Sequence, residues 1–149
     1  MAYVLEAFLG LQKDLQVIAD TYNNAQIKAL GQSIALIPMT EELYDEINKF
    51  TVSEDIDPFT YLTTYMEETI LNTISLKTIG YVEAEYFGGI GSQFGILWEN
   101  GKRYKILNSG YDAINFILEH LGVVAAIGKD EFDTLGFGKR RQTADWLRK

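Results

Sequence analysis

Residues 79–107 decide the fold, and they read IGYVEAEYFGGIGSQFGILWENGKRYKIL. Aromatic and β-branched residues fill 79–87 and 93–99, which is the composition of β-strands. The Asn100-Gly101 pair predicts a two-residue hairpin turn, because both central positions of a type I′ turn need positive φ. Tyr104 to Leu107 then complete a meander. We therefore expect an antiparallel hairpin meander at the centre of a sheet.

Local signals upstream and downstream predict further strands and helices. Strands are expected at 3–9, 25–30 and 33–39, from their alternating or continuous apolar patterns. Thr40 is the expected N-cap of one helix, and Asp57-Pro58 predicts the start of another that runs to about residue 75. The Ser109-Gly110-Tyr111-Asp112 sequence predicts a capped helix that ends at Gly122. A last helical turn at 143–148 is expected to bury Trp146.

These elements define a fold class. Hairpins and helices occur without a regular β-α-β alternation, which favours an antiparallel or mixed sheet over a parallel one. The 149 residues suit one domain. We therefore predict a single acidic α+β domain, residues 1–149, with a central hairpin meander covered by helices.

The composition indicates the cellular compartment and excludes several kinds of reactive site. There are no cysteines, which excludes disulfides, thiolate metal sites and cysteine nucleophiles and suits a reducing cytosol. The N-terminal residues lack the basic segment and long apolar run of a signal peptide, and no apolar run approaches the roughly 20 residues of a membrane span. We expect a cytoplasmic protein that needs no membrane and no cofactor.

The charge of the chain is unevenly distributed. The net charge is −8, but residues 139–149 carry five cations and one carboxylate, so residues 1–138 carry −12. A body with this charge repels nucleic acid and anionic membranes and attracts basic partners. The basic tail is expected to fold back on the acidic body; a small anion contact is the alternative.

Carboxylates concentrate in one stretch that holds a single cation, Lys49. Such a run is either a solvated helical face or a docking surface for a basic partner. The candidate partner-binding residues in it are Glu41, Glu42, Asp45, Glu46, Glu54, Asp55 and Asp57. Glu83 and Glu85 are a second choice. They lie two apart on one strand and so share a face, where a solvated or salt-bridged role is the main expectation.

Other motifs favour a ligand site only weakly. The Gly88-Gly89-Ile90-Gly91-Ser92 segment has the glycines of a phosphate-binding loop, but a strand follows it and no Lys is in place. A wide hairpin loop is the preferred interpretation. The alternative ligand site would bring Glu83 and Glu85 together with a second set of residues. That set is Gly88, Gly89, Gly91, Gln93, Arg140 and Arg141.

The single histidine offers no catalytic or metal-binding constellation. His120 falls in the last turn of a helix, where a dipole or C-terminal hydrogen bond is expected. One His without Cys is an unusual metal site outside the hard cations, and no nucleophile elbow accompanies it. We therefore expect no catalytic residues and no metal ligands.

Three segments together show a resemblance. Residues 81–93, 130–138 and 141–146 carry the pattern E-x-E-Y-F-G-G-x-G, D-E-F-D-x-x-G-x-G and R-x-T-x-D-W. In this order they resemble a group of small, stand-alone bacterial proteins without an assigned function, and residues 34–40 fit the same pattern. The resemblance implies a bacterial cytoplasmic origin and brings no catalytic residues. Immunity proteins that neutralise bacterial toxins are similar only in general style.

The leading hypothesis is a protein-binding module, of the immunity type, that masks a basic surface on a toxin or nuclease. The alternative is a small-molecule- or nucleotide-binding protein or an enzyme built around residues 88–92. A homo-oligomer with an interface of aromatic strands is the third. The sequence leaves the oligomeric state open.

Overall fold

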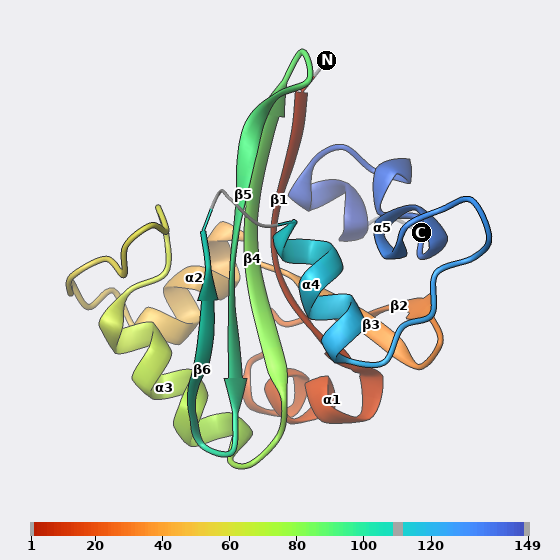
Figure 1. Cartoon of the computed structure of the whole chain (residues 1–149). Coiled ribbons are helices and arrows are strands. Elements are labelled where there is room, and N and C mark those ends of the chain that lie inside the picture. The colour runs from red at the N-terminus through yellow and green to blue at the C-terminus, as the bar shows by residue number, and fades with distance from the viewer. Residues whose placement is uncertain (1, 109–111, 148–149) are drawn as a thin grey trace.

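A six-stranded antiparallel sheet organises the computed structural model, with the strand order β2-β3-β1-β4-β5-β6 (Figure 1). The structure describes residues 2–108 and 112–147. The strands are β1 (Ala2–Leu11), β2 (Lys28–Gly31), β3 (Ile34–Pro38), β4 (Ile79–Phe87), β5 (Ile90–Glu99) and β6 (Lys102–Leu107). The fold is α+β, as predicted, and the β4-β5-β6 meander forms one half of the sheet.

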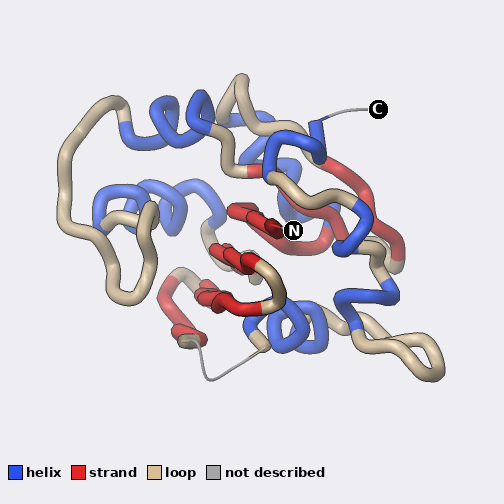
Figure 2. The backbone as a smooth tube through the Cα atoms, turned by 90° about the horizontal axis from the view of Figure 1, so that it is seen from above, coloured by secondary structure: helices blue, strands red, loops and turns tan. Residues whose placement is uncertain are grey.

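Helices cover both faces of the sheet, so that the strands form a middle layer (Figure 2). The first face carries α1 (Gln12–Thr21), α2 (Glu41–Asn48) and α3 (Thr64–Ile74). The second carries α4 (Ala113–His120), α5 (Glu131–Thr134) and the 3₁₀ turns η1 (Phe137–Lys139) and η2 (Thr143–Leu147). None of the helices in the described part of the chain is long and apolar enough to span a bilayer.

Two apolar cores follow from the alternation of side chains along the central strands. On β1, Phe8 packs into the core beneath α1, α2 and α3, whereas Leu5 and Leu9 pack into the core beneath α4. Both faces of β4 are covered, so residues 79–84 are all buried. This coverage explains why β4 lacks the clean polar and apolar alternation of a half-exposed strand.

Helix α3 begins six residues later than the sequence predicts. The predicted start at Asp57-Pro58 is wrong, because this pair lies within the connection between α2 and α3. The observed N-cap is Thr63, whose hydroxyl accepts the N–H of Met66 at 3.1 Å. A contact made by Glu83, described below, captures the backbone N–H groups of residues 60–62. A tertiary contact therefore overrides a local helix signal.

The C-terminal segment closes the second face. Trp146 is buried, as predicted, and Phe137 packs against it with ring centroids 6.0 Å apart. The N–H of Val4 donates to the carbonyl of Arg141, and the Tyr3 hydroxyl donates to the carbonyl of Phe137. The predicted cap residues Ser109, Gly110 and Tyr111, and the tail cations Arg148 and Lys149, lie outside the described residues.

Candidate functional site

Glu83 is a buried carboxylate that holds a loop. It lies on the first face together with Glu85 and Tyr81, as the spacing predicts. Its side chain accepts the backbone N–H groups of residues 60–62 at 2.7 to 3.2 Å, and the Tyr81 hydroxyl at 2.9 Å. Glu83 is 6% exposed. The expectation of a solvated or salt-bridged side chain was wrong for this residue, while Glu85 is exposed.

Glu6 is the functional candidate that sequence reasoning missed. It stands directly opposite Glu83 in the β1–β4 register, so the two carboxylates share the first face. Burial, followed by the negative charge of Glu83, raises the pKa of Glu6 to about 7, and the Thr143 hydroxyl opposes this shift. The Thr143 hydroxyl lies 3.3 Å from Glu6 Oε1. A lone carboxylate inside an apolar strand was the available signal, but its partner is known only once β1 pairs with β4.

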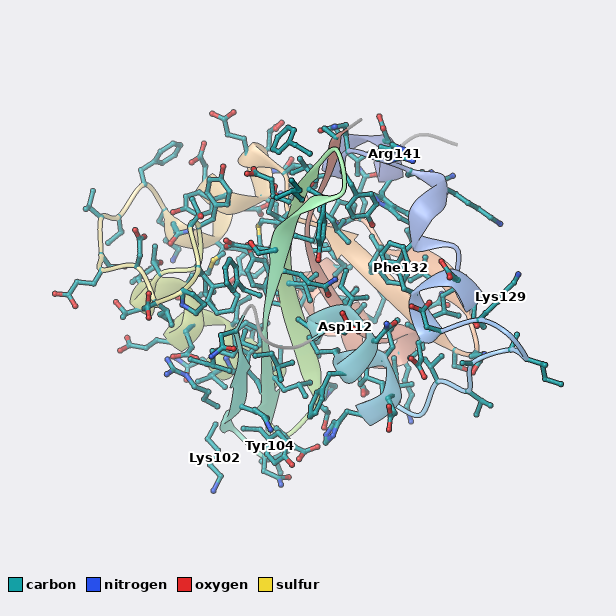
Figure 3. The ribbon with its side chains drawn as sticks, turned by 45° about the horizontal axis from the view of Figure 1, so that its top comes forward. Lys102, Tyr104, Asp112, Lys129, Phe132 and Arg141 are labelled. Atoms are coloured by element: carbon teal, nitrogen blue, oxygen red, sulfur yellow. The ribbon has the colours of Figure 1, made fainter. Side chains whose placement is uncertain are left out.

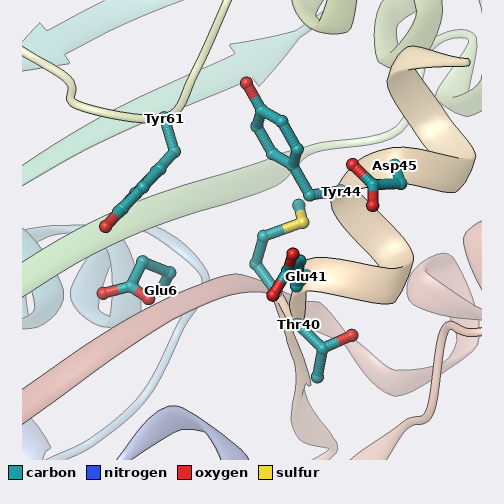
Figure 4. A pocket seen from close by; sticks show the side chains of 7 residues that line it. Glu6, Thr40, Glu41, Tyr44, Asp45 and Tyr61 are labelled. Atoms are coloured by element: carbon teal, nitrogen blue, oxygen red, sulfur yellow. The ribbon is translucent and has the colours of Figure 1, made fainter. Parts of the chain in front are cut away.

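A cavity of about 440 Å³ opens between β1, α2 and the 57–63 loop (Figure 4). Its lining consists of Glu6, Met39, Thr40, Glu41, Tyr44, Asp45 and Tyr61. Figure 4 shows Glu6 on the β1 side and the α2 side chains opposite, with the Tyr61 ring extending from the loop. The rings of Tyr44 and Tyr61 meet edge to face at 6.4 Å. We call this space the acidic cavity.

A second, smaller space continues the acidic cavity along the sheet. It measures about 180 Å³ and shares Glu6 and Tyr61 with the first. Its carboxylates besides Glu6 are Glu83 and Glu85. No Lys, Arg or His among the described residues lines either space. Low-dielectric walls around charges of one sign concentrate the negative potential here.

The first two turns of α2 position two of the acidic residues in the cavity. The Thr40 hydroxyl accepts the N–H of Leu43 at 3.2 Å and so caps the helix, as predicted. Glu41 follows this cap, and Asp45 lies one turn later on the same side of the helix. Burial raises the pKa of Tyr44, and the charges of Asp55, Asp45 and Glu83 add to the shift. Carboxylates from α2, from the connection and from β4 therefore all act on the pKa of one tyrosine.

The remaining predicted acidic residues have different roles. Glu46 accepts the backbone N–H groups of Asn23 and Asn24 at 2.8 and 2.9 Å, which ties the end of α1 to α2. Glu42 is exposed, and so are three residues of the connection between α2 and α3. These three are Glu54, Asp55 and Asp57. The structure thus brings Glu41 and Asp45 together with Glu6, and places Asp55 near Tyr44.

The glycine segment forms a tight turn. Gly88 and Gly89 have φ of +60° and +82°, and β5 begins at Ile90, so the predicted wide loop at 88–92 was wrong. Gly91 pairs with Tyr86 inside the hairpin. A Cβ at Gly91 would lie 1.9 Å from the carbonyl oxygen of Glu85. The need for a glycine here is therefore steric.

The residues of the alternative ligand site do not converge. Gln93 lies on the second face, where its amide donates to the Tyr86 hydroxyl at 3.0 Å and accepts the N–H of Ile114 at 2.8 Å. Glu83 and Glu85 lie on the first face, so the sheet separates them from Gln93. The Arg140 guanidinium lies over the ring of buried Trp146, 5.1 Å from its centroid, and Arg141 is exposed. The expectation of one shared pocket was wrong.

A cavity of about 260 Å³ does exist on the second face. It is lined by Tyr3, Tyr86, Gln93, Asp112, Ile114, Asn115, Asp130 and Phe132, with Asp112 and Phe132 labelled in Figure 3. Two of the segments that carry the resemblance therefore meet there. Its amides are already engaged, however, because Asn115 donates to Asp130 at 3.0 Å and accepts the N–H of Phe132 at 2.8 Å.

His120 does not line any of the three spaces described above. It lies in the last turn of α4, as predicted, and its Nε2 is 3.1 Å from Glu99 Oε1 on β5. Its hydrogen bond therefore goes to a side chain of the sheet, and the Tyr104 ring lies 5.2 Å away. Within the described residues, no three His, Cys, Asp or Glu side chains are grouped so that they could hold a metal ion.

Comparisons with protein-family models, with curated proteins and with solved structures give no match to this chain.

Proposed function

We propose that the protein is a binding module that masks a basic surface of a partner protein, in the manner of an immunity protein. It would do so through the acidic face formed by Glu6, Glu41, Asp45, Asp55 and Glu85. The observation that carries the proposal is the acidic cavity, which has three carboxylates and two tyrosines in its lining and no described cation. A surface that leaves its carboxylates without internal counter-charges is complementary to a basic partner.

The surroundings of the cavity support a protein partner. Tyr61 is 49% exposed at the rim, and Phe50 and Val52 project from the same connection with 83% and 96% exposure. Partly exposed aromatic residues beside polar groups are typical anchors of protein interfaces. A net charge of −8 adds long-range attraction to a basic partner. The partner class is therefore a protein with an arginine- and lysine-rich surface, such as a nuclease toxin.

The binding face is held in place before a partner arrives. The hydrogen bonds from the N–H groups of residues 60–62 to the Glu83 carboxylate, which we call the Glu83 clamp, hold the loop in place. The Thr40 cap does the same for the start of α2. Preorganised groups lose less conformational entropy on association. We therefore expect the acidic face to change little on binding.

The test compares the wild-type chain with a variant whose acidic face is neutralised by Glu41→Gln, Asp45→Asn, Asp55→Asn and Glu85→Gln. Both are immobilised at equal density and exposed to a bacterial lysate. A retained protein is then purified and titrated at 50 and 200 mM salt. We expect affinity to fall with salt and to drop at least tenfold for the variant, which corresponds to about 1.4 kcal/mol.

A matched control carries four neutralised carboxylates elsewhere on the surface: Asp20→Asn, Glu68→Gln, Glu119→Gln and Asp133→Asn. Its net charge equals that of the face variant. If both variants bind the purified protein equally well, the acidic face has no special role and the proposal is wrong. Failure to retain any protein whose affinity depends on the acidic face would also contradict it.

The second candidate function is small-molecule binding in the 260 Å³ cavity, favoured by the meeting of residues from 81–93 and 130–138 there. A thermal-shift screen with nucleotides, sugar phosphates and divalent ions tests it, since a ligand that binds only the folded chain raises its melting temperature. A rise that Gln93→Ala abolishes would support this function. No rise with any compound would count against it.

A further inference from the structure

We propose that the acidic cavity receives the guanidinium group of one arginine side chain of the partner, and that the Glu6 carboxylate pairs with it. This inference rests on the proposed function and names the chemical group that the partner would present. It also goes beyond a general attraction between charged surfaces, because it requires one side chain to enter one cavity.

The size of the cavity fits such a group. A volume of about 440 Å³ lies within the range of small-ligand sites, roughly 300–1,000 Å³. It far exceeds the volume needed by a single water or a bare metal ion, since a water takes up about 30 Å³ of liquid volume. The occupant is therefore expected to be a group with several heavy atoms.

The lining favours a planar cation with several donors. Carboxylates reach the space from two elements, with Glu6 on β1 and Glu41 and Asp45 on α2. A guanidinium carries five N–H donors in a flat fork and can bond to more than one carboxylate, whereas an ammonium acts as a point charge. The rings of Tyr44 and Tyr61 add π surfaces on which guanidinium groups stack. These features favour arginine over lysine.

Glu6 is the carboxylate in most need of a counter-charge. Its neighbour across the strands, Glu83, has its four hydrogen bonds from the loop and Tyr81. For Glu6 the hydrogen bond within the described structure is the longer contact with Thr143, at 3.3 Å. The half-buried Glu6 side chain thus faces a cavity next to a second carboxylate. An arriving cation would offset both the burial and the repulsion.

Protonation of Glu6 is expected to control this binding. The titratable groups that face it are Tyr81, Glu83 and Glu85 on β4, Glu41, Tyr44 and Asp45 on α2, and Tyr61 on the loop. On the side of η2, the neutral Thr143 hydroxyl contacts it. Burial and the charge of Glu83 raise the pKa of Glu6 to about 7. A cation would bind the ionised form, so affinity should rise with pH.

Methyl NMR of methionine tests the inference at the site itself. Met39 lines the cavity, whereas Met66 is fully buried in α3 and serves as an internal reference. The probe is the peptide acetyl-Gly-Arg-Gly-amide, compared with versions that carry lysine or citrulline. We expect a saturable shift of the Met39 methyl signal with arginine, a weaker one with lysine and none with citrulline, which is neutral.

The pH series and the Glu6→Gln variant complete the test. Between pH 6 and pH 8 the ionised fraction of a group with pKa about 7 rises from about one tenth to nine tenths, so the affinity for the arginine peptide should rise about tenfold. Glu6→Gln should weaken binding and remove this rise. Glu68→Gln, an exposed substitution on α3 with the same charge change, should retain it.

Three results would overturn the inference: no saturable Met39 shift with the arginine peptide, an equal shift with citrulline, or an unchanged pH profile in Glu6→Gln. The two proposals fail separately. A purified partner that depends on the acidic face while the peptide leaves Met39 unchanged would refute the arginine site and retain the binding function. If the peptide binds but no partner depends on the acidic face, the arginine site is retained and the proposed binding function is refuted.

Discussion

Two carboxylates that face each other across β1 and β4 have opposite surroundings. Four donors hold Glu83, whereas Glu6 has Thr143 and an open cavity. A buried carboxylate with hydrogen-bond donors contributes to the fold, while one without a counter-charge costs stability. The difference lies in what the neighbouring loop provides, because both residues are glutamates at equivalent positions of paired strands.

Glu6→Gln is expected to stabilise the protein at alkaline pH. The pKa of Glu6 is about 7 in the folded chain and about 4.3 in an unfolded one. Between these values the folded state binds more protons, so the unfolding free energy falls as pH rises. Gln cannot ionise and avoids this loss, by about 1–2 kcal/mol at pH 8 after allowance for solvent exposure.

Urea denaturation of wild type and Glu6→Gln at pH 4, 6 and 8 measures this effect. The two chains should be nearly equally stable at pH 4, already differ at pH 6, and reach the full difference by pH 8, because the loss develops between the two pKa values. A variant that is less stable than wild type at pH 8 would contradict the assigned environment of Glu6.

Glu83→Ala should destabilise the chain by about 3–5 kcal/mol, because it leaves buried donors of the loop and of Tyr81 without their acceptor. The exposed neighbour Glu85→Ala is the control, with an expected change within about 0.5 kcal/mol. Chemical denaturation gives both values. Hydrogen exchange at residues 60–62 should also accelerate in Glu83→Ala, and unchanged protection there would show that the clamp is absent.

At the scale of elements, helix caps can be compared within the same chain. Thr40 caps α2 through its hydroxyl, whereas Asp112 at the start of α4 makes no side-chain cap bond. We expect Thr40→Ala to cost about 1 kcal/mol and Asp112→Ala to cost far less. Thermal unfolding followed by circular dichroism measures both, and equal losses would contradict the assignment of the Thr40 cap.

Interactions between residues that are neighbours in the sequence predicted most of the helices and strands, but few of the residues that line the acidic cavity. The Thr40 cap, the Asn100-Gly101 turn with φ of +56° and +79°, and the strand at 79–87 depend on neighbouring residues, and the structure confirms them. The prediction of a helix start at Asp57-Pro58 was wrong because Glu83, on strand β4, accepts a backbone N–H group of the loop.

Prediction of the acidic cavity would have required knowledge of contacts between residues that are distant in the sequence. Glu41 and Asp45 were identified from their density in the sequence, but Glu6 reaches them only through the packing of β1 beside α2. Conversely, Gln93 and Glu83 are close in sequence yet lie on opposite faces of the sheet, because strand alternation and hairpin register separate them. Strand pairing was the missing information in both cases.

At the scale of the whole molecule, the C-terminal segment completes the second core. Trp146 packs there with Phe137, and Glu6 N–H donates to Thr143 from the same segment. We expect Trp146→Ala to cost about 3–5 kcal/mol, the usual range for a large buried aromatic side chain. The fully exposed Ile127→Ala is the control, with a change within about 0.5 kcal/mol. Urea denaturation gives both changes in the free energy of unfolding. A small decrease for Trp146→Ala would mean that the C-terminal segment contributes little to the packing of the second core.

The position of β1 between β3 and β4 also sets the pace of folding. Its register joins Ala2 to Phe87 and Gly10 to Ile79, so the middle of the sheet closes only when distant parts of the chain meet. Because such pairings have high contact order, they slow the search for the native topology. On the ribosome, the first strand emerges long before its β4 neighbour is synthesised. Until then, the backbone N–H and C=O groups along that edge of β1 lack the partners that β4 supplies in the folded chain, and an unpaired strand edge of this kind is a template for pairing with other chains.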